Sequence, residues 1–437
     1  MFKAKHVHFI GVGGIGVSAV AKMVLGRKVA VSGSDLNDSA LIDELRKGGA
    51  VIYLGHDAKN VPADCELVVY TNALREDNPE LLEAEKRGLK KLSYPEALGE
   101  ISRGQFVIAI SGNAGKTTTT AMIGQILINA DLHPTIIVGS LANFVDQNGK
   151  TEKTNFVLGN GKYFVVEADE YKRAFLNLEP NILVINNIEA DHLDYYKNLD
   201  DIQNAFAELV TKIPKNGFVI CRAKDKNVMP LLARARAKIL DYTDTSLSNY
   251  SISLPGEHNR DNAKAAIAVA DILGIEKEVT KKSLSNFIGP WRRFEYKGKT
   301  KSGAILYDDY AHNPRKIRAV IAGAKEKFPE KRIVIIFQPH LFSRTKHLLG
   351  ELSESFLGAD RVIVTPIYAA RESVDPSITH SSLRDAIIVS QTVKQVETAD
   401  SFNSVKDMLE TEGEGTVCLT IGAGDIHSLS NLILDKS

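Results

Sequence analysis

A strand-like run that leads into a glycine turn and a lysine constrains the fold of this chain more than any other feature. The segment reads Ile108-Ala109-Ile110-Ser111-Gly112-Asn113-Ala114-Gly115-Lys116-Thr117-Thr118-Thr119-Thr120. Glycines let backbone N–H groups surround phosphate oxygens at the start of a helix, where the helix dipole also favours negative charge. The segment therefore predicts an α/β domain that binds the phosphates of a nucleotide.

The residues of this loop have distinct expected roles. Lys116 would neutralise charge on the β- and γ-phosphates, and the Thr117 hydroxyl would ligate Mg²⁺. Ile110 stands where the general GxxxxGK[ST] pattern has its outer glycine, so the loop is a variant of that pattern. The expected nucleotide-binding residues are Gly112, Asn113, Ala114, Gly115, Lys116, Thr117 and Thr118.

Apolar strand-sized runs alternate with helix-period segments, which is the βαβ pattern of parallel sheets covered by helices. This alternation begins three times, and 437 residues are too many for one ordinary hydrophobic core. We expect an α/β fold of three domains: a Rossmann-like domain over 1–103, a central P-loop domain with a mostly parallel sheet over 104–290, and a second Rossmann-like domain over 291–437. The expected helices include 15–25, 40–47, 117–129, 314–327 and 345–357.

Composition excludes several classes of protein. Lys plus Arg and Asp plus Glu number 54 each, so no net field favours nucleic acid or an anionic membrane. No apolar stretch approaches the roughly 18 to 20 residues that span a bilayer, and the first apolar run breaks into glycines before a signal-peptide core forms. The three cysteines are widely spaced, which indicates reduced thiols. We expect a cytoplasmic protein without a nucleic-acid or membrane partner.

A second glycine-rich turn, Gly11-Val12-Gly13-Gly14-Ile15-Gly16, follows the first strand-like run and opens a helix. Ser34 and Asp35 lie at the end of the next strand. This spacing matches the fingerprint that places a dinucleotide pyrophosphate at a helix N-terminus, so by itself it predicts NAD or FAD. A tight turn without a ligand is the alternative interpretation.

Two acidic segments follow strands of the central domain. In Glu167-Ala168-Asp169-Glu170, the first carboxylate would lie at the carboxyl edge of the sheet and could share a cation with Thr117. In the segment 185–194, His192 lies among acids and suits a second divalent ion or a phosphate oxygen. The alternatives are a solvated acidic loop and a histidine hydrogen-bonded within its loop.

Three further segments carry candidate ligand-binding side chains. His258, Asn259 and Asn262 offer imidazole and amide edges that suit a purine base, although Asn259 could instead cap a helix. Arginines in 291–295 and 337–345 could clamp a phosphate or a carboxylate, or form surface ion pairs. Between these two segments lies Tyr307-Asp308-Asp309-Tyr310-Ala311-His312-Asn313-Pro314, again after a strand.

The order of these motifs resembles the Mur ligase family over essentially the whole chain. The motifs are GxGGIG, GKTTTT, EADE, NIEADH, GEHNxxNxxAA, RRFE, DDYAHNP and FQPHxxxRT. The first and the last three look most like the branch that adds L-alanine. The resemblance implies an ATP-dependent ligase of peptidoglycan biosynthesis that joins L-alanine to the carboxylate of UDP-N-acetylmuramate through an acyl phosphate.

The resemblance also implies roles for residues at matching positions. The N-terminal domain would bind the UDP-sugar rather than NAD, with ATP and Mg²⁺ or Mn²⁺ in the central domain, in a monomer or homodimer. The implied UDP-sugar residues are Gly11, Gly13, Gly14, Ile15, Gly16, Ser34, Asp35 and His56; the metal ligands are Thr117, Glu167 and His192. Adenine would contact His258, Asn259 and Asn262, a phosphate Arg293, the ribose Asp309, and the amino acid Tyr310, His312 and Arg344. The implied catalytic residues are Lys116, His192, His312 and Arg344.

The chain departs from the pattern of the L-alanine branch at three places. Asn113-Ala114 stand where that branch usually has Thr-His, Leu341 replaces an arginine, and Tyr171-Lys172 replace the common Ser-Asp. The stretch 204–208 also lacks the carbamylated lysine of several other members, as the L-alanine branch does. Lys116, Thr117 and Arg344 remain, so we predict an active enzyme.

Three alternatives stay open at this point. A recycling ligase that attaches a ready-made tripeptide to UDP-N-acetylmuramate often has the motif EADEY, as at 167–171. A nicotinamide oxidoreductase would explain the first glycine turn but leaves the second without a role. A nucleotide-binding protein without catalysis is compatible with Ala114 and Leu341.

Overall fold

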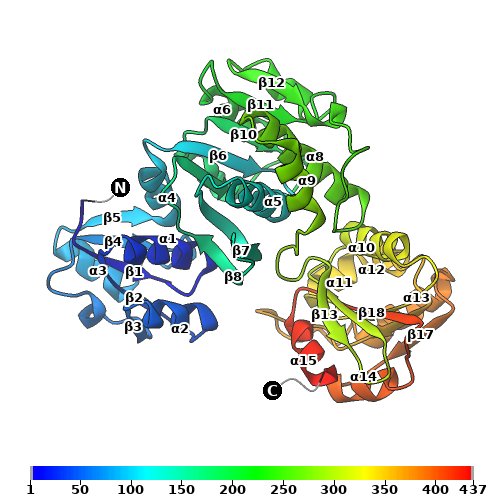
Figure 1. The fold of residues 1–437 in the computed structure, drawn as a ribbon. Coiled ribbons are helices and arrows are strands. Elements are labelled where there is room, and N and C mark those ends of the chain that lie inside the picture. The colour runs from blue at the N-terminus through cyan, green and yellow to red at the C-terminus, as the bar shows by residue number, and fades with distance from the viewer. Residues whose placement is uncertain (1–2, 435–437) are drawn as a thin grey trace. The chain divides into compact units, whose positions relative to one another are not determined.

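The computed structural model describes residues 3–434 and contains three sheets, each built from its own stretch of the chain (Figure 1). The first sheet has the strand order β3-β2-β1-β4-β5 and is parallel throughout. Its strands are β1 His6–Ile10, β2 Ala30–Asp35, β3 Val51–Leu54, β4 Leu67–Tyr70 and β5 Lys90–Ser93. The strand order changes direction at β1 and β4, and in α/β sheets ligands bind beyond the carboxyl ends at such a point.

Four helices connect these strands: α1 Ile15–Gly26, α2 Ala40–Lys47, α3 Pro79–Lys86 and α4 Tyr94–Ser102. Val17, Val20 and Val24 recur at helical spacing on α1 and are buried, so this helix packs through one apolar face. The Asn78 side chain caps α3, which begins with Pro79 at a position where the N–H that proline lacks is not needed.

The central sheet has seven strands in the order β12-β11-β10-β6-β9-β7-β8. They are β6 Phe106–Ser111, β7 Thr135–Val145, β8 Thr151–Val157, β9 Tyr163–Glu167, β10 Ile182–Ile185, β11 Phe218–Cys221 and β12 Lys238–Asp241. Only β8 runs antiparallel, paired with β7. The helices that follow the first domain are α5 Lys116–Asn129, α6 Leu199–Thr211, α7 Met229–Leu232, α8 Glu257–Ile272 and α9 Lys277–Ser285. The same part of the chain contains the 3₁₀ turns η2 Tyr171–Asn177 and η3 Tyr242–Asp244, and the first domain contains η1 Ala58–Asn60.

The third sheet has six strands in the order β13-β14-β18-β15-β16-β17, of which only β13 is antiparallel. The strands are β13 Glu295–Lys299, β14 Ile305–Asp309, β15 Arg332–Phe337, β16 Arg361–Val364, β17 Gln395–Thr398 and β18 Thr416–Ile421. The helices are α10 Pro314–Lys327, α11 Phe342–His347, α12 Leu349–Ser353, α13 His380–Ser390, α14 Phe402–Leu409 and α15 Leu429–Ile433, with the 3₁₀ turn η4 Asp425–Ser428. Three mostly parallel sheets confirm the predicted α/β fold.

The single helix predicted over 345–357 is wrong. The chain enters α11 earlier, because Leu341 adopts a positive φ of 69° and turns the backbone into the helix. Leu348, with φ −101° and ψ 14°, then separates α11 from α12. Gly350 follows this break, and glycine lowers helix propensity there.

The chain forms two compact units. The first comprises Met1–Ser251 and Asp261–Phe287 and holds the first two sheets; the second comprises Ile252–Arg260 and Ile288–Ser437 and holds the third. One of the three breaks between these units, after Arg260, falls within α8. The two boundaries between the three predicted domains stay a prediction.

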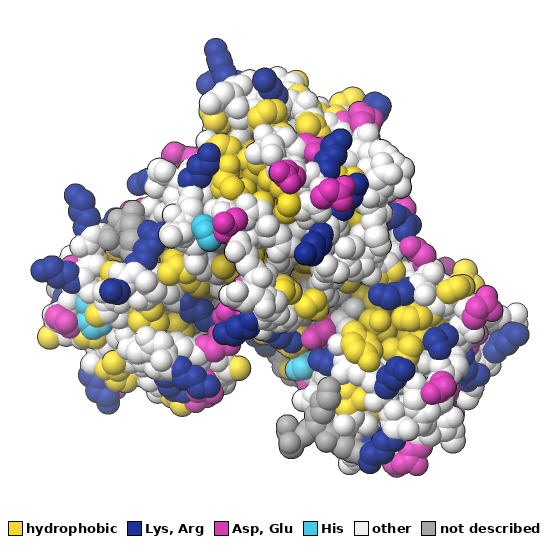
Figure 2. Space-filling model, viewed as in Figure 1, with side chains coloured by type: hydrophobic (Ala, Val, Ile, Leu, Met, Phe, Trp, Pro, Cys, Tyr) yellow, Lys and Arg dark blue, Asp and Glu magenta, His cyan; other side chains and the backbone are white. Residues whose placement is uncertain are grey.

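The surface and the cysteines agree with the composition. Lys and Arg side chains are interspersed with Asp and Glu over the face drawn in Figure 2. Cys65, Cys221 and Cys418 are buried and form no disulfide. Within residues 3–434, no helix combines the length and the apolar character needed to cross a membrane.

Candidate active site

The predicted phosphate loop connects β6 to α5. Gly112 and Gly115 have φ angles of 126° and 83°, which side-chain-bearing residues rarely adopt. A Cβ atom on Gly115 would also collide with the Asn262 side chain. Gly115 is the N-cap of α5 and supplies no side-chain cap, so the first amides of the helix are left for a ligand such as a phosphate.

The loop after β10 holds the phosphate loop in place. The Ala114 N–H donates to Asn187 Oδ1 at 2.9 Å, and Asn187 Nδ2 donates to the Ala114 carbonyl at 3.1 Å. The Glu189 N–H donates to Asn113 Oδ1 at 2.7 Å. Asn113 Nδ2 is buried and has no hydrogen-bond partner among residues 3–434, so this donor fits an added phosphate oxygen. The departures at 113 and 114 therefore leave the loop well supported.

An acidic cluster lies beside the first turn of α5. Thr117 Oγ1 donates to Glu167 Oε1 at 3.1 Å, and the Gly139 N–H donates to Glu167 Oε2 at 2.7 Å. Lys116 Nζ lies 2.5 Å from Glu170 and 3.8 Å from Asp169. The Glu170 side chain is 1% exposed and that of Asp169 is 55% exposed, so Glu170 is the interior partner of the lysine.

The charges of this cluster suit a divalent cation. Burial lowers the pKa of Lys116, but the carboxylates of Glu170, Asp169 and Glu167 outweigh burial and raise it, so the ammonium is held protonated. Burial raises the pKa of Glu167. Three carboxyl groups surround this one ammonium, and carboxylate and hydroxyl oxygens are the ligands that Mg²⁺ prefers.

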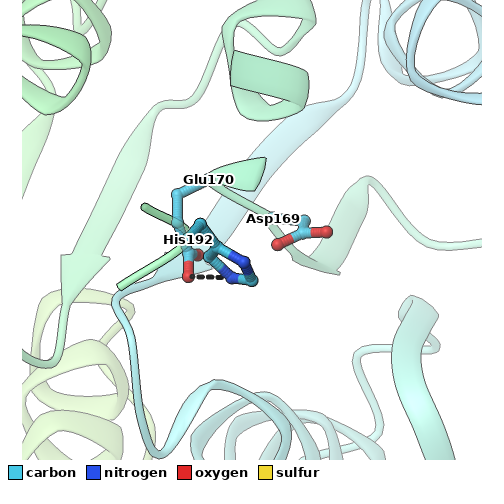
Figure 3. A group of neighbouring side chains, drawn as sticks. All are labelled: Asp169, Glu170 and His192. Atoms are coloured by element: carbon cyan, nitrogen blue, oxygen red, sulfur yellow. Dashed lines mark ion pairs between the residues drawn. The ribbon is translucent and has the colours of Figure 1, made fainter. Parts of the chain in front are cut away.

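His192 extends the cluster (Figure 3). One ligand atom each from Asp169, Glu170 and His192 lie within 4.8 Å of one another. His192 Nε2 is 3.7 Å from Glu170 Oε1, a buried oxygen without a hydrogen-bond partner in the described chain. The Tyr171 ring lies against the imidazole, with centroids 4.8 Å apart, and its hydroxyl donates to Asp194 at 2.9 Å. Asp169, Glu170 and His192 therefore fit a metal site. Tyr171, one of the departures from the family pattern, orients the His192 ring.

The first glycine turn is built around the end of β2. The Gly11 N–H donates to the Ser34 carbonyl at 2.8 Å, and the Gly13 N–H donates to Asp35 Oδ2 at 2.9 Å. His56 Nδ1 lies 2.9 Å from Ser34 Oγ. The Ser34 side chain is fully buried, whereas that of His56 is 13% exposed. Asp35 and His56 therefore lie beside the turn at the carboxyl edge, and Ser34 lies beneath them.

Three predicted nucleotide residues gather beside Tyr310, a predicted amino-acid residue, in the second compact unit. Asp309 accepts hydrogen bonds from the N–H groups of Phe294, at 2.7 Å, and of residue 311, at 2.8 Å, and burial raises the pKa of Asp309 to about 6. The Arg293 guanidinium lies 5.7 Å from the centre of the Tyr310 ring. Burial, followed by the charge of Arg293, lowers the pKa of His258. These interactions bring His258, Arg293, Asp309 and Tyr310 together.

Arg292 precedes Arg293 in the sequence but has a different environment. Arg292 is buried, and its guanidinium donates to Asp308 at 2.8 Å and to the carbonyl of Gly424 at 3.0 Å. It is therefore a structural residue. On α8, Asn259 Nδ2 donates to the Pro255 carbonyl at 2.7 Å and so ties the helix to the segment before it. Asn262, in the first compact unit, accepts from Asn186 Nδ2 at 3.5 Å.

The predicted amino-acid residues of the second unit form one group. His312 Nδ1 lies 3.0 Å from the Tyr310 carbonyl, and burial, with nearby Lys316, lowers the pKa of His312 to about 3. This imidazole is neutral under ordinary conditions. An Arg344 guanidinium nitrogen lies 3.1 Å from His340 Nδ1, and the rings of His312 and His340 lie 6.2 Å apart.

Sequence reasoning assigned no role to three residues of these groups. Glu170 belongs to the acidic motif, but a loop carries no periodicity that shows which acid points inward. His340 follows β15 and could have been found from its place at a strand end. Tyr368, stacked on His340 with centroids 5.7 Å apart, had no local signal.

Comparison with family models covers most of the chain. Residues 6–106 match the model described as Mur ligase family, catalytic domain. Residues 110–250 match the Mur ligase middle domain, and residues 292–424 match the Mur ligase, glutamate ligase domain. The three matches follow the three sheets in order.

Individual relatives match over the full length. The chain is 40% identical to the UDP-N-acetylmuramate–L-alanine ligase of Clostridium acetobutylicum, over 99% of this chain and 98% of the relative, and 39% identical to that of Clostridium kluyveri, over 99% of both. The crystal structure of UDP-N-acetylmuramate-alanine ligase from Thermotoga maritima aligns with a TM-score of 0.81 at 28% identity, over 99% of this chain and 98% of that one. A murein peptide ligase from Psychrobacter arcticus, 23% identical with a TM-score of 0.66 over 99% and 98% of the two chains, shares the fold. The chain therefore belongs to the Mur ligase family.

Proposed function

We propose that this protein is an ATP-dependent ligase that joins L-alanine to the carboxylate of UDP-N-acetylmuramate in peptidoglycan synthesis. The observation that carries the proposal is the 40% identity to an L-alanine ligase over 99% of the chain. The placement of Lys116, Thr117 and Glu167 around the phosphate loop supports it. We place the reaction in the cytoplasm, where ATP is available.

In the proposed reaction, the UDP-N-acetylmuramate carboxylate attacks the γ-phosphate of ATP and forms an acyl phosphate and ADP. The amino group of L-alanine then attacks the acyl carbon, and phosphate leaves with one former carboxylate oxygen. Such chemistry needs charge stabilisation and positioning rather than a protein nucleophile. Lys116 and the first amides of α5 stabilise the negative charge on the phosphates.

We propose that Thr117, Glu167 and His192 hold Mg²⁺ or Mn²⁺, with Glu170 beside them. A bound divalent cation would neutralise phosphate charge during transfer. Glu170 holds the Lys116 ammonium next to the phosphate loop, and Tyr171 orients the His192 ring. Nucleotide binding then draws the lysine from this carboxylate toward the phosphates.

We assign the nucleoside and the amino acid to the other predicted residues. His258, Asn259 and Asn262 contact adenine, ionised Asp309 accepts from a ribose hydroxyl, and Arg293 contacts a phosphate. In the second group, Arg344 binds the carboxylate of L-alanine, because a guanidinium matches a carboxylate in a bidentate pair. Neutral His312 accepts a hydrogen bond from the amino group, and Tyr310 lies beside it. Gly11, Gly13, Gly14, Ile15, Gly16, Asp35 and His56 bind the UDP-sugar, and Ser34 supports them.

The recycling ligase is the second candidate, favoured by Tyr171 after the acidic motif. In the structure this tyrosine contacts His192 and Asp194, which belong to the proposed metal region. These contacts do not bear on the choice of acceptor. The L-alanine ligase is therefore the better-supported function.

Phosphate release and product mass distinguish the candidates. ATP, Mg²⁺ and UDP-N-acetylmuramate are supplied with L-alanine, L-serine, glycine or a cell-wall tripeptide, each separately, with Lys116→Ala as the inactive control. We expect turnover with L-alanine and a product heavier by one alanine residue. Turnover with the tripeptide but with none of the amino acids would show that the protein is a recycling ligase. No turnover with any acceptor would reject both candidates.

A further inference from the structure

A fully buried carboxylate lies in the N-terminal domain, outside the groups described above. Glu80 is the second residue of α3 and is 0% exposed. Its Oε2 accepts a hydrogen bond from Ser34 Oγ at 2.5 Å and lies 3.4 Å from His8 Nε2. Its Oε1 accepts from Asn60 Nδ2 at 2.7 Å and from the Asp57 N–H at 3.2 Å. Both carboxylate oxygens are thus engaged.

These partners keep the carboxylate ionised inside the domain. Burial raises the pKa of Glu80, but hydrogen bonds from His8, Ser34 and Asn60 outweigh burial and lower it. The position at the start of α3 adds a favourable helix dipole. Without this carboxylate, each buried donor would lose its hydrogen-bond acceptor, which costs free energy. The carboxylate therefore holds its donors firmly in place.

Three of the four donors, all except His8 in the middle of β1, belong to segments at the carboxyl edge of the sheet. Ser34 precedes Asp35 at the end of β2, and Asp57 and Asn60 follow β3, next to His56. His56 Nδ1 lies 2.9 Å from Ser34 Oγ and 3.6 Å from Glu80 Oε2. One interior carboxylate therefore holds the end of β2 and the loop after β3 in a fixed relation.

The exposed side of the same segments carries groups that we assign to the UDP-sugar. Asp35 receives the Gly13 N–H at 2.9 Å, which ties the glycine turn to the end of β2. The His56 side chain is partly exposed, whereas the Glu80 side chain beside it is fully buried. Movement of the backbone at Ser34 or His56 would displace Asp35 and the His56 imidazole from the glycine turn.

We propose that Glu80 is a positioning residue for UDP-sugar binding, which holds the end of β2 and His56 in the arrangement that receives the substrate. This role rests on the proposed function. Glu80 does not touch the substrate, so its effect appears in affinity for the UDP-sugar rather than in the chemical step. A purely stabilising role would instead lower the unfolding temperature without a selective change in UDP-sugar affinity.

Glu80→Gln tests this role, because the amide keeps the size of the side chain but replaces one acceptor oxygen with a donor. We expect the dissociation constant and the KM for UDP-N-acetylmuramate to rise roughly ten-fold. The KM values for ATP and L-alanine, and kcat, should change less than about two-fold. The matched control is Glu85→Gln on the same helix, an acid that is 69% exposed and pairs with Lys91.

Ser34→Ala provides a second test if Glu80→Gln does not fold, because it removes one donor and leaves the buried carboxylate in place. It should also raise the dissociation constant for the UDP-sugar while ATP binding is retained. Wild-type chain that fails to bind UDP-N-acetylmuramate would overturn the proposed function together with this role. Wild-type binding that is unchanged in Glu80→Gln, or in Ser34→Ala where the former does not fold, would overturn the role of Glu80 alone.

Discussion

At the scale of single residues, burial separates side chains that look equivalent in the sequence. Asp169 and Glu170 are adjacent acids, yet only Glu170 is buried, and it lies 2.5 Å from Lys116 Nζ whereas Asp169 lies 3.8 Å away. Arg292 and Arg293 are adjacent arginines, yet Arg292 is committed to Asp308. In each pair, the buried member is held by other groups of the protein: Glu170 by Lys116, and Arg292 by Asp308.

Asp309 yields a prediction about pH. Its pKa of about 6 lies above the usual value of 3.8 because the carboxyl is buried, so it becomes protonated as the pH falls through about 6. Protonation removes the negative charge that strengthens the hydrogen bond we assign to the ribose hydroxyl. The ratio of the ADP dissociation constant of Asp309→Asn to that of the wild type should be large at pH 8 and approach one at pH 5.

Calorimetric titration of ADP into both proteins, from pH 8 down to pH 5, measures this ratio. The wild type at each pH is the reference for the variant at the same pH, so the titration of ADP itself cancels. A ratio that stays constant over the whole range would contradict the assignment of Asp309.

At the scale of helices and strands, the two loops at the carboxyl edge of the central sheet act as one structure. Asn187 exchanges two hydrogen bonds with the backbone of Ala114, and Glu189 donates to Asn113. The loop that carries His192 therefore also fixes the phosphate loop. These hydrogen bonds explain how the phosphate loop is supported with Asn113 and Ala114 in place of the usual Thr-His.

Asn187→Ala should disturb both loops, because it removes the side chain that pairs with Ala114. We expect a loss of about 1–2 kcal/mol in the free energy of unfolding and a several-fold increase in the KM for ATP. Urea unfolding and steady-state kinetics measure the two effects. Asn177→Ala, which removes only a local hydrogen bond to the Ala174 carbonyl, is the control. A KM for ATP that matches the control would contradict the role of Asn187.

Much of the fold could be predicted at this scale because buried parallel strands are continuous apolar runs. α2 and α10 have the predicted bounds, and the first glycine turn and the phosphate loop each precede a helix as expected. The β7–β8 hairpin could not be predicted in this way, because an antiparallel edge pair lacks that apolar continuity. The break at Leu348 was missed because helix periodicity continues across it.

The candidate site could be predicted where a motif follows a strand, because the carboxyl ends of parallel strands meet at one edge. Lys116, Thr117 and Glu167 are brought together in this way. Glu80 could not be predicted, because an acid in the first turn of a helix is usually exposed and stabilised by the helix dipole. Its burial depends on donors from β2 and η1, far away in sequence.

At the scale of the whole molecule, the three sheets carry three groups of residues that the sequence predicts to bind ligands. Each group lies at the carboxyl edge of its sheet: the glycine turn with Asp35, the phosphate loop with Glu167, and Asp309 with His312 and Arg344. We propose that these groups bind the UDP-sugar, ATP and L-alanine. The equal numbers of acidic and basic residues mean that local groups, rather than a net charge, attract these anionic ligands.

The central claim is that the substrate carboxylate is activated by phosphoryl transfer before L-alanine attacks. The most direct test uses UDP-N-acetylmuramate labelled with ¹⁸O in its carboxylate, together with ATP, Mg²⁺ and L-alanine, and mass analysis of the released phosphate. We predict that each phosphate released carries one oxygen from the labelled carboxylate. Alanine-dependent release of unlabelled phosphate would contradict the acyl-phosphate route.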